Sequence, residues 1–173
     1  MSEIKLIDLP CKVLPHLRVG DRVVFSGKIL VGRDAALPRV CALLNSDQEE
    51  MLGVDSAGAA VLHSAVSPAG IGPTSSNKVE IEESFGPLLK AGVRVFLGKG
   101  AISSKTVSLL DEFGAVFAVV PPVTALLGKG MKASRLVAFP ELGMEALYEI
   151  DLEECPAVIA AARGTSIFEK AES

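Results

Sequence analysis

The amino-acid sequence predicts an α/β fold in one domain. From about residue 84 onward, strand-like and helix-like apolar patterns alternate, which implies parallel strands joined by crossover helices. The first half adds further β-branched runs. With 173 residues, of which 49% are hydrophobic and 22% charged, the chain can form one substantial core and is not a disordered tail. We predict a single domain over residues 1–173, with a mixed sheet whose parallel portion lies in the C-terminal half.

The first half is expected to begin with two short strands and a helix. Residues 23–25 and 29–31 are apolar, largely β-branched runs that Ser26-Gly27, a turn signal, separates. The helix follows, with Asp34 as its expected N-cap. Pro38 then falls in the first turn, where a missing amide hydrogen is tolerated.

A strand region at 57–66 and a turn-rich segment at 67–73 lead into the second half. There, Gly92 and Gly114 are expected to end helices, and Ser103 or Ser104 to begin one. The elements expected in the second half are a helix at 84–90, a strand at 93–97, a helix from 103 or 104 to 113, an apolar strand at 115–120, a helix at 122–127, a strand at 136–139, a helical or turn segment at 140–147 and a last buried strand at 157–161.

Charge and cysteine content exclude several classes of protein. A net charge of −4 and a pI of about 5.3 argue against a nucleic-acid binder, which normally carries a basic excess. The longest apolar run, 115–128, contains two prolines and is too short for the roughly 20 residues of a membrane span. Cys11, Cys41 and Cys155 are scattered and predict neither disulfides nor a zinc site. We expect a cytoplasmic chain, apolar enough to favour a hidden interface.

Three glycine-flanked polar clusters each follow an expected strand, and ligands of open α/β sheets bind outside the carboxyl ends of strands. Arg33 and Lys99 each precede an expected helix start, which attracts anions. Together the clusters would form a pocket of three cations and several hydroxyls, suited to a small carboxylate or phosphate. The alternative is that these cations are surface charges beside ordinary turns. The clusters are Gly32-Arg33-Asp34, Gly72-Pro73-Thr74-Ser75-Ser76-Asn77-Lys78 and Gly98-Lys99-Gly100.

Four motifs, taken in order, resemble the class I (iron–sulfur) fumarase and L-tartrate dehydratase family. Order and spacing agree over about residues 20–168, and the match is to the β subunit, equivalent to the C-terminal domain of the single-chain enzymes. The resemblance implies a swivelling β/β/α three-layer domain, similar to the mobile domain of aconitase-like enzymes. The motifs are Phe25-Ser26-Gly27-Lys28-Ile29 running into Gly32-Arg33-Asp34-Ala35-Ala36, then Gly72-Pro73-Thr74-Ser75-Ser76, Leu97-Gly98-Lys99-Gly100, and Val137 through Ala146.

The resemblance also implies a function. The chain would be the β subunit of a hydro-lyase that interconverts fumarate and S-malate, active only with its α subunit in an α2β2-like hetero-oligomer. A [4Fe–4S] cluster, with one iron open to substrate, would lie in the α subunit, and this chain would bind no cofactor or metal. Two alternatives stay open: the β subunit of L-tartrate dehydratase or a related diacid dehydratase, and a non-catalytic α/β binding or assembly module.

The same resemblance assigns roles to single residues. Thr74 would be the catalytic base that takes the C3 proton of the substrate. Arg33, Lys78 and Lys99, with the hydroxyl of Ser75, would bind the substrate carboxylates. The supporting residues would be Asp34, Gly72, Gly98 and Gly100.

Two residues depart from the family pattern. Leu37 stands where the family usually has a histidine, so whatever that imidazole does elsewhere is absent here. Lys78, four residues after Thr74, stands where the family typically has an arginine. Because lysine cannot bind a carboxylate bidentately, this change predicts an altered affinity or choice of substrate. The alternative is that an insertion has shifted the equivalent residue along the chain.

Overall fold

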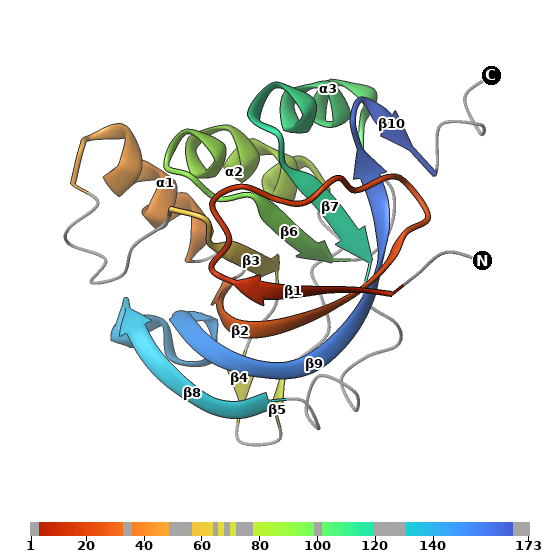
Figure 1. Cartoon of the computed structure of the whole chain (residues 1–173). Coiled ribbons are helices and arrows are strands. Elements are labelled where there is room, and N and C mark those ends of the chain that lie inside the picture. Colours follow the sequence, from red (N-terminus) through yellow and green to blue (C-terminus); the bar gives the residue numbers. More distant parts are fainter. Residues whose placement is uncertain are drawn as a thin grey trace.

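The computed structural model describes residues 4–32, 36–48, 57–63, 66–67, 70–71, 78–98, 102–119 and 131–167 (Figure 1). In chain order the elements are β1 (Lys5–Leu9), β2 (Arg22–Gly32), α1 (Leu37–Asn45), β3 (Ala60–His63), β4 (Val66–Ser67), β5 (Gly70–Ile71), α2 (Lys78–Lys90), β6 (Val95–Gly98), α3 (Ser104–Phe113), β7 (Val116–Val119), β8 (Met131–Ala138), the 3-10 helix η2 (Pro140–Glu145), β9 (Leu147–Ala162) and β10 (Thr165–Ser166). The predicted α/β class is confirmed.

The main sheet of the described residues closes on itself. Its strands follow the order β1-β2-β3-β6-β7-β9-β10, with β8 beside β9. Strand β9 also pairs with β2, so β2, β3, β6, β7 and β9 form a ring. The pairs from β1 to β7 are parallel, whereas β9 is antiparallel to each of its partners. The sheet is mixed, as predicted, but its parallel part reaches into the N-terminal half, because β1, β2 and β3 belong to it.

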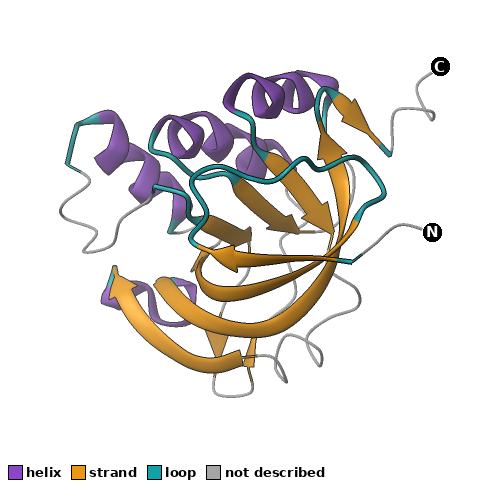
Figure 2. Ribbon diagram, viewed as in Figure 1, coloured by secondary structure: helices purple, strands orange, loops and turns teal. Residues whose placement is uncertain are grey.

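Three layers are visible in Figure 2: the helices, the short strands β3, β6 and β7, and the long curved strands β2 and β9 with β8. Consecutive residues of the short strands face the two sides in turn. On β6, Phe96 belongs to a core shared with the helices, and Val95 and Leu97 to a second core shared with β2 and β9. Because both faces are covered, these strands are apolar throughout, as is typical of buried parallel strands.

Strand β2 corrects the prediction of two strands with a turn at Ser26-Gly27. The chain continues as one strand of 11 residues, and its register with β9 shifts between Phe25 and Gly27. Gly27 has φ +114°, and a Cβ there would lie 2.2 Å from the carbonyl oxygen of Leu9 on β1. Glycine is therefore required because two strands approach each other closely here. In the sequence, a glycine needed for this reason looks the same as a glycine in a turn.

The ends of the helices were predicted with mixed success. Helix α1 has Ala36, not Asp34, at its N-cap, although Pro38 does lie in the first turn. Helix α3 begins after Ser103, whose side chain accepts from the Thr106 amide, and it ends at Gly114 with φ +67°. Both ends of α3 are as predicted, because they depend on local cap geometry.

Several elements are longer than predicted or were not predicted at all. Helix α2 begins six residues before the predicted start, and β8 and β9 extend the predicted strands 136–139 and 157–161 toward the N-terminus. Strands β1 and β10 were not predicted. The helix predicted at 122–127 lies outside the described residues.

Candidate functional site

The carboxyl ends of four parallel strands meet at one edge of the sheet. Gly32 of β2 pairs with His63 of β3, Leu62 with Leu97 of β6, and Gly98 with Val119 of β7. One strand, β3, separates Gly32 from Gly98, so their backbones lie about 10 Å apart, two strand spacings of about 4.8 Å. Arg33 and Lys99 follow these two glycines directly in the sequence. The edge is thus where ligands of parallel α/β sheets bind.

Gly98, one of the predicted supporting residues, is needed at this edge for packing. A Cβ on Gly98 would lie 3.3 Å from the Phe117 ring of β7. At Gly32, a Cβ would lie 3.2 Å from the Leu37 side chain of α1 and 3.4 Å from that of Leu147. Both glycines therefore allow close packing where β2 and β6 end.

The starts of α1 and α3 differ in how their amides are bound. The N-cap of α1 is Ala36, which has no side-chain acceptor. At α3, the amide of Thr106 donates to Ser103 Oγ at 3.3 Å, and the amide of Ser103 donates to Glu82 Oε1 at 2.9 Å. The expectation that the helix after Lys99 offers free amides to an anion is therefore wrong for these two groups.

Glu82, which the sequence analysis missed, connects α2 to the start of α3. Its Oε1 atom accepts from Ser103 Oγ at 2.6 Å and from Thr106 Oγ1, as well as from the Ser103 amide. A carboxylate at a helix N-terminus is favoured by the helix dipole. No local pattern identifies this contact, because the cap comes from another helix 21 residues earlier.

The described part of the fourth motif lies against α1. Glu141 of η2 forms an ion pair with Arg39 of α1, with Oε1 and Nη1 2.6 Å apart. The Arg39 guanidinium also lies 5.7 Å from the centre of the Phe139 ring. Gly143 has φ +61°, and its carbonyl oxygen accepts from the Tyr148 hydroxyl at 3.2 Å. These contacts give the motif a structural role next to the helix that follows Arg33.

Most of the predicted site residues lie outside the described residues: Arg33, Asp34, Gly72, Thr74, Ser75, Lys99 and Gly100. Of the others, Gly98 ends β6 and Lys78 is the first residue of α2. Because α2 leads into β6, its first turn lies at the same edge as the ends of the parallel strands. Leu37, which replaces the family's usual histidine, is buried in the core under the helices.

The described cysteines do not fit an iron–sulfur cluster. Cys11 follows β1, Cys41 lies in α1, and Cys155 lies in β9 within the second core. Burial raises the pKa of the Cys41 and Cys155 thiols to about 11, which disfavours the thiolate that binds iron. Across the described ranges, no three His, Cys, Asp or Glu side chains could together hold a metal ion.

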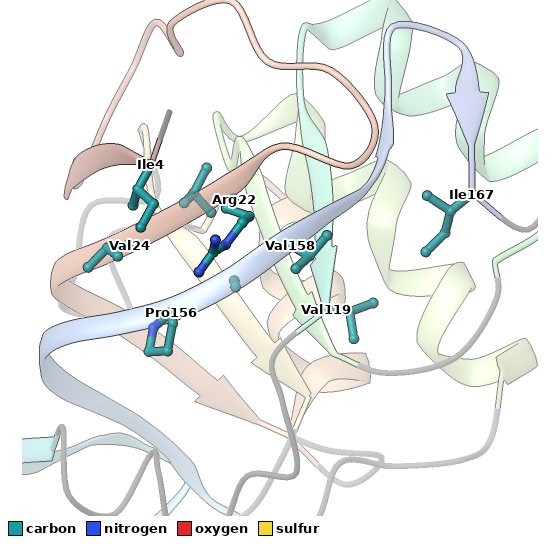
Figure 3. Close-up of a pocket in the computed structure, with 9 residues that line it drawn as sticks. Ile4, Arg22, Val24, Val119, Pro156, Val158 and Ile167 are labelled. Carbon is teal, nitrogen blue, oxygen red and sulfur yellow. The ribbon is translucent and has the colours of Figure 1, made fainter. Parts of the chain in front are cut away.

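An apolar groove of about 340 Å³ lies over β2 and β9 (Figure 3). Val119 at the carboxyl end of β7 lines it, together with Pro156 and Val158 of β9. Ile4 and Ile167 lie on either side of β9 in this view, and both are exposed. The groove therefore reaches the edge where the parallel strands end, because Val119 is the direct register partner of Gly98.

A second hollow, of about 370 Å³, lies at the opposite edge, where β7 begins. His16 and Arg163 line it, with Arg163 Nη1 3.0 Å from His16 Nδ1. Arg18 Nε lies 3.2 Å from the other ring nitrogen, and Lys5 forms an ion pair with Asp21 at 3.1 Å. The neighbouring Arg163 and Arg18 guanidinium groups lower the pKa of His16. This cluster lies far from the edge that carries the candidate site.

In the described part of the chain, no helix is both long and apolar enough to cross a membrane.

Comparison with known proteins agrees with the sequence motifs. The family model described as the fumarase C-terminus matches residues 2–171. The anaerobic class I fumarate hydratase of Escherichia coli (strain K12) is 28% identical over 167 residues, 91% of this chain and 30% of that protein. The chain thus spans less than a third of the length of that relative.

Two relatives are close to this chain in length. A protein of Methanocaldococcus jannaschii, provisionally named L(+)-tartrate dehydratase subunit beta, is 30% identical over 174 residues, 92% of this chain and 87% of that protein. The L(+)-tartrate dehydratase subunit beta of Escherichia coli (strain K12) is 26% identical over 164 residues, 87% of this chain and 78% of that protein.

Proposed function

Because the chain belongs to the fumarase C-terminus family, as its four motifs predicted, we propose that it is the β subunit of a two-subunit hydro-lyase. The proposed reaction is the interconversion of fumarate and S-malate. The observation that carries the proposal is the edge where β2 and β6 end: Gly32 and Gly98 lie there on either side of β3, each directly followed by a cation in the sequence. Two cations placed in this way suit the two carboxylates of a diacid.

The proposed site residues have two roles, to bind the substrate carboxylates and to remove a proton. Dehydration of malate removes a proton from C3, next to a carboxylate, while hydroxide leaves C2. Arg33, Lys78 and Lys99 bind the two carboxylates, with Ser75, and stabilise the negative charge that develops as the proton leaves. Thr74 takes the proton from C3, and the surrounding positive charge favours its anionic form. The first turn of α1, whose N-cap has no side-chain acceptor, begins shortly after Arg33 in the sequence and adds amide donors.

The proposal includes a partner. A diacid bound at an open sheet edge needs a second surface to exclude water, and the relatives named β subunits belong to proteins with another subunit. We place the [4Fe–4S] cluster in that α subunit, within an α2β2-like assembly in the cytoplasm, and expect this domain to swivel against it. The domain is proposed to be a single unit over residues 1–173.

A second candidate function is dehydration of L-tartrate or a related diacid. It is favoured by the two relatives of similar length, both named after tartrate dehydratase, one of them provisionally. Lys78 in place of arginine is compatible with a different diacid, since it changes how a carboxylate is bound. A non-catalytic binding or assembly role is the third candidate.

The test is to produce the chain together with its α partner without oxygen and to follow the ultraviolet absorbance of fumarate. Malate, tartrate and citramalate are compared as substrates. We expect turnover of malate and fumarate by the complex, and neither activity nor iron in this chain alone. A preference for tartrate would support the second candidate. A complex that turns over none of these diacids would support the third.

Two substitutions test the site itself. Thr74→Ala and Lys99→Ala are expected to abolish most turnover, whereas Lys90→Ala, at the far end of α2, should leave it unchanged. Unchanged turnover in Thr74→Ala and Lys99→Ala would show that the site is assigned to the wrong residues.

A further inference from the structure

We propose that Glu82 is a positioning residue of the hydro-lyase site, which fixes the first turns of α2 relative to the connection between β6 and α3. This inference rests on the proposed function, because its effect is on the binding of the diacid. Glu82 itself is not proposed to touch the substrate.

Glu82 accepts hydrogen bonds from two residues at the start of α3. One carboxylate oxygen accepts from the amide of Ser103 at 2.9 Å, from its hydroxyl at 2.6 Å and from the hydroxyl of Thr106. Ser103 Oγ also accepts from the Thr106 amide at 3.3 Å. Thr106 is buried. Hydrogen bonds to a charged acceptor are stronger than those between neutral groups, so these contacts favour one arrangement of the junction.

Glu82 and Ser103 each lie a few residues after a proposed substrate-binding cation in the sequence. Glu82 comes four residues, about one helical turn, after Lys78, the first residue of α2. Ser103 comes four residues after Lys99, on the connection that leaves the sheet at Gly98. The carboxylate therefore joins the two segments that carry two of the three proposed substrate-binding cations.

The Glu82 carboxylate also affects where an anion can bind near the start of α3. The Glu82 carboxylate binds the Ser103 amide at the start of α3, a position that an anionic ligand would otherwise favour. With that donor already bound, the Ser103 amide is not open to the carboxylates of a diacid, which leaves the proposed cations as their partners. Glu82 thus holds Ser103, four residues after Lys99 in the sequence, against α2.

The experiment uses the complex of this chain with its α partner. Glu82→Gln keeps the shape and one acceptor oxygen but removes the charge, and Glu82→Ala removes the whole contact. We expect Glu82→Ala to raise the KM for the diacid about tenfold, while kcat changes far less, because misplaced binding groups weaken substrate and transition state alike. Glu82→Gln should lie between Glu82→Ala and the unmodified complex. Glu83→Gln, an exposed neighbour on α2, is the matched control.

A double-mutant cycle separates positioning from a structural role. If Glu82 acts through Ser103, the KM of Glu82→Ala combined with Ser103→Ala should be no higher than that of the more affected single variant. A structural role alone would lower the melting temperature or the yield of complex and leave KM unchanged, which would overturn the inference. So would a Glu82→Gln complex that matches the Glu83→Gln control in KM.

The outcome also distinguishes this inference from the proposed function. If the unmodified complex turns over no diacid, the proposed function fails, and the inference fails with it. If the unmodified complex is active and the Glu82 variants are unchanged, the inference alone fails.

Discussion

The ring of Phe85 on α2 is stacked on the ring of Phe96 on β6, with centroids 4.0 Å apart and 14° between the ring planes. Both side chains are buried in the core under the helices. The pair holds α2 on the sheet, and therefore also holds the first turn of α2 at the edge of the candidate site. Phe117 of β7 lies next to it, 6.5 Å from Phe85 between centroids.

The first prediction concerns this stacked pair. Phe85→Ala should lower the free energy of unfolding by about 3–5 kcal/mol, because it leaves a cavity between α2 and the sheet. Urea unfolding followed by circular dichroism measures the change. Phe113→Ala on α3 is the control: Phe113 is half-exposed, so its loss should cost less. Equal losses in the two variants would contradict the importance of the stack.

The second prediction concerns Gly98. Gly98→Ala should lower the free energy of unfolding by about 1–3 kcal/mol, since its Cβ would press on the Phe117 ring in a filled core. Combining it with Phe117→Leu should recover part of the loss.

Gly86 provides the matched control for Gly98. It lies inside α2, where a Cβ would meet nothing within 4 Å. Gly86→Ala should change the free energy of unfolding by less than about 1 kcal/mol, because the higher helix propensity of alanine is offset by the position of its Cβ before Pro87. A Gly98→Ala chain as stable as Gly86→Ala would mean that the strand end is not tightly packed.

The third prediction concerns the thiols. Burial raises the pKa of Cys41 and Cys155 from the ordinary 9.0 to about 11, so the folded chain favours the protonated thiol. The resulting stability is fully present below pH 9 and is lost as the pH rises from 9 to 11. Stability measured across this window should fall less steeply in the variant with Cys41→Ala and Cys155→Ala.

Labelling with a thiol reagent at pH 8 provides an independent check. In the folded chain, Cys41 and Cys155 should react far more slowly than in guanidinium chloride, because the thiolate is the reactive form. Rapid reaction of Cys155 in the folded chain would show that it is not buried as described.

The fourth prediction concerns the departure at Lys78. In the complex with the α partner, Lys78→Arg should lower the KM for the preferred diacid, since a guanidinium binds a carboxylate through two parallel hydrogen bonds. Lys90→Arg, the same change at the other end of α2, should leave KM as it is. A higher KM in Lys78→Arg than in Lys90→Arg would indicate that the site is shaped for lysine.

The parts of the fold that follow local rules were predicted from the sequence. Ser103 and Gly114 determine the two ends of α3 through a side-chain cap and a left-handed residue, both of which depend on a few neighbouring residues. The alternation of strands and helices in the second half likewise predicted the parallel strands β6 and β7.

The long strand β9 was not predicted in full, because its pattern is interrupted. Phe25 pairs with Cys155 and Gly27 with Leu152, so Glu153 and Glu154 together lie opposite Ser26. Two consecutive charged residues are typical of a loop, so the sequence did not predict a strand there. In the structure they form a bulge, and the Glu154 amide donates to the Ser26 hydroxyl at 3.0 Å. The partner strand that makes this possible lies about 130 residues away in the sequence, where no local pattern reports it.

Long-range contacts also limited the prediction of the candidate site. Each glycine-flanked cluster was predicted to follow a strand, and Gly32 and Gly98 do end two parallel strands of one sheet, with β3 between them. Glu82 could not be assigned in this way, because its partner Ser103 belongs to another helix. The apolar composition, which favoured a hidden interface, is explained in part by strands that bury both faces. The interface itself stays a prediction.

Strand β9 has a consequence for how the chain folds as it is synthesised. It pairs with β2 along most of that strand, and Val158 near its end is the partner of Arg22 near the start of the chain. Strand β2 therefore keeps one edge uncovered until β9 has left the ribosome. Strand pairs between residues that lie far apart in the sequence form slowly. A chain cut short before β9 would expose two strand edges, those of β2 and β7, and such edges promote aggregation.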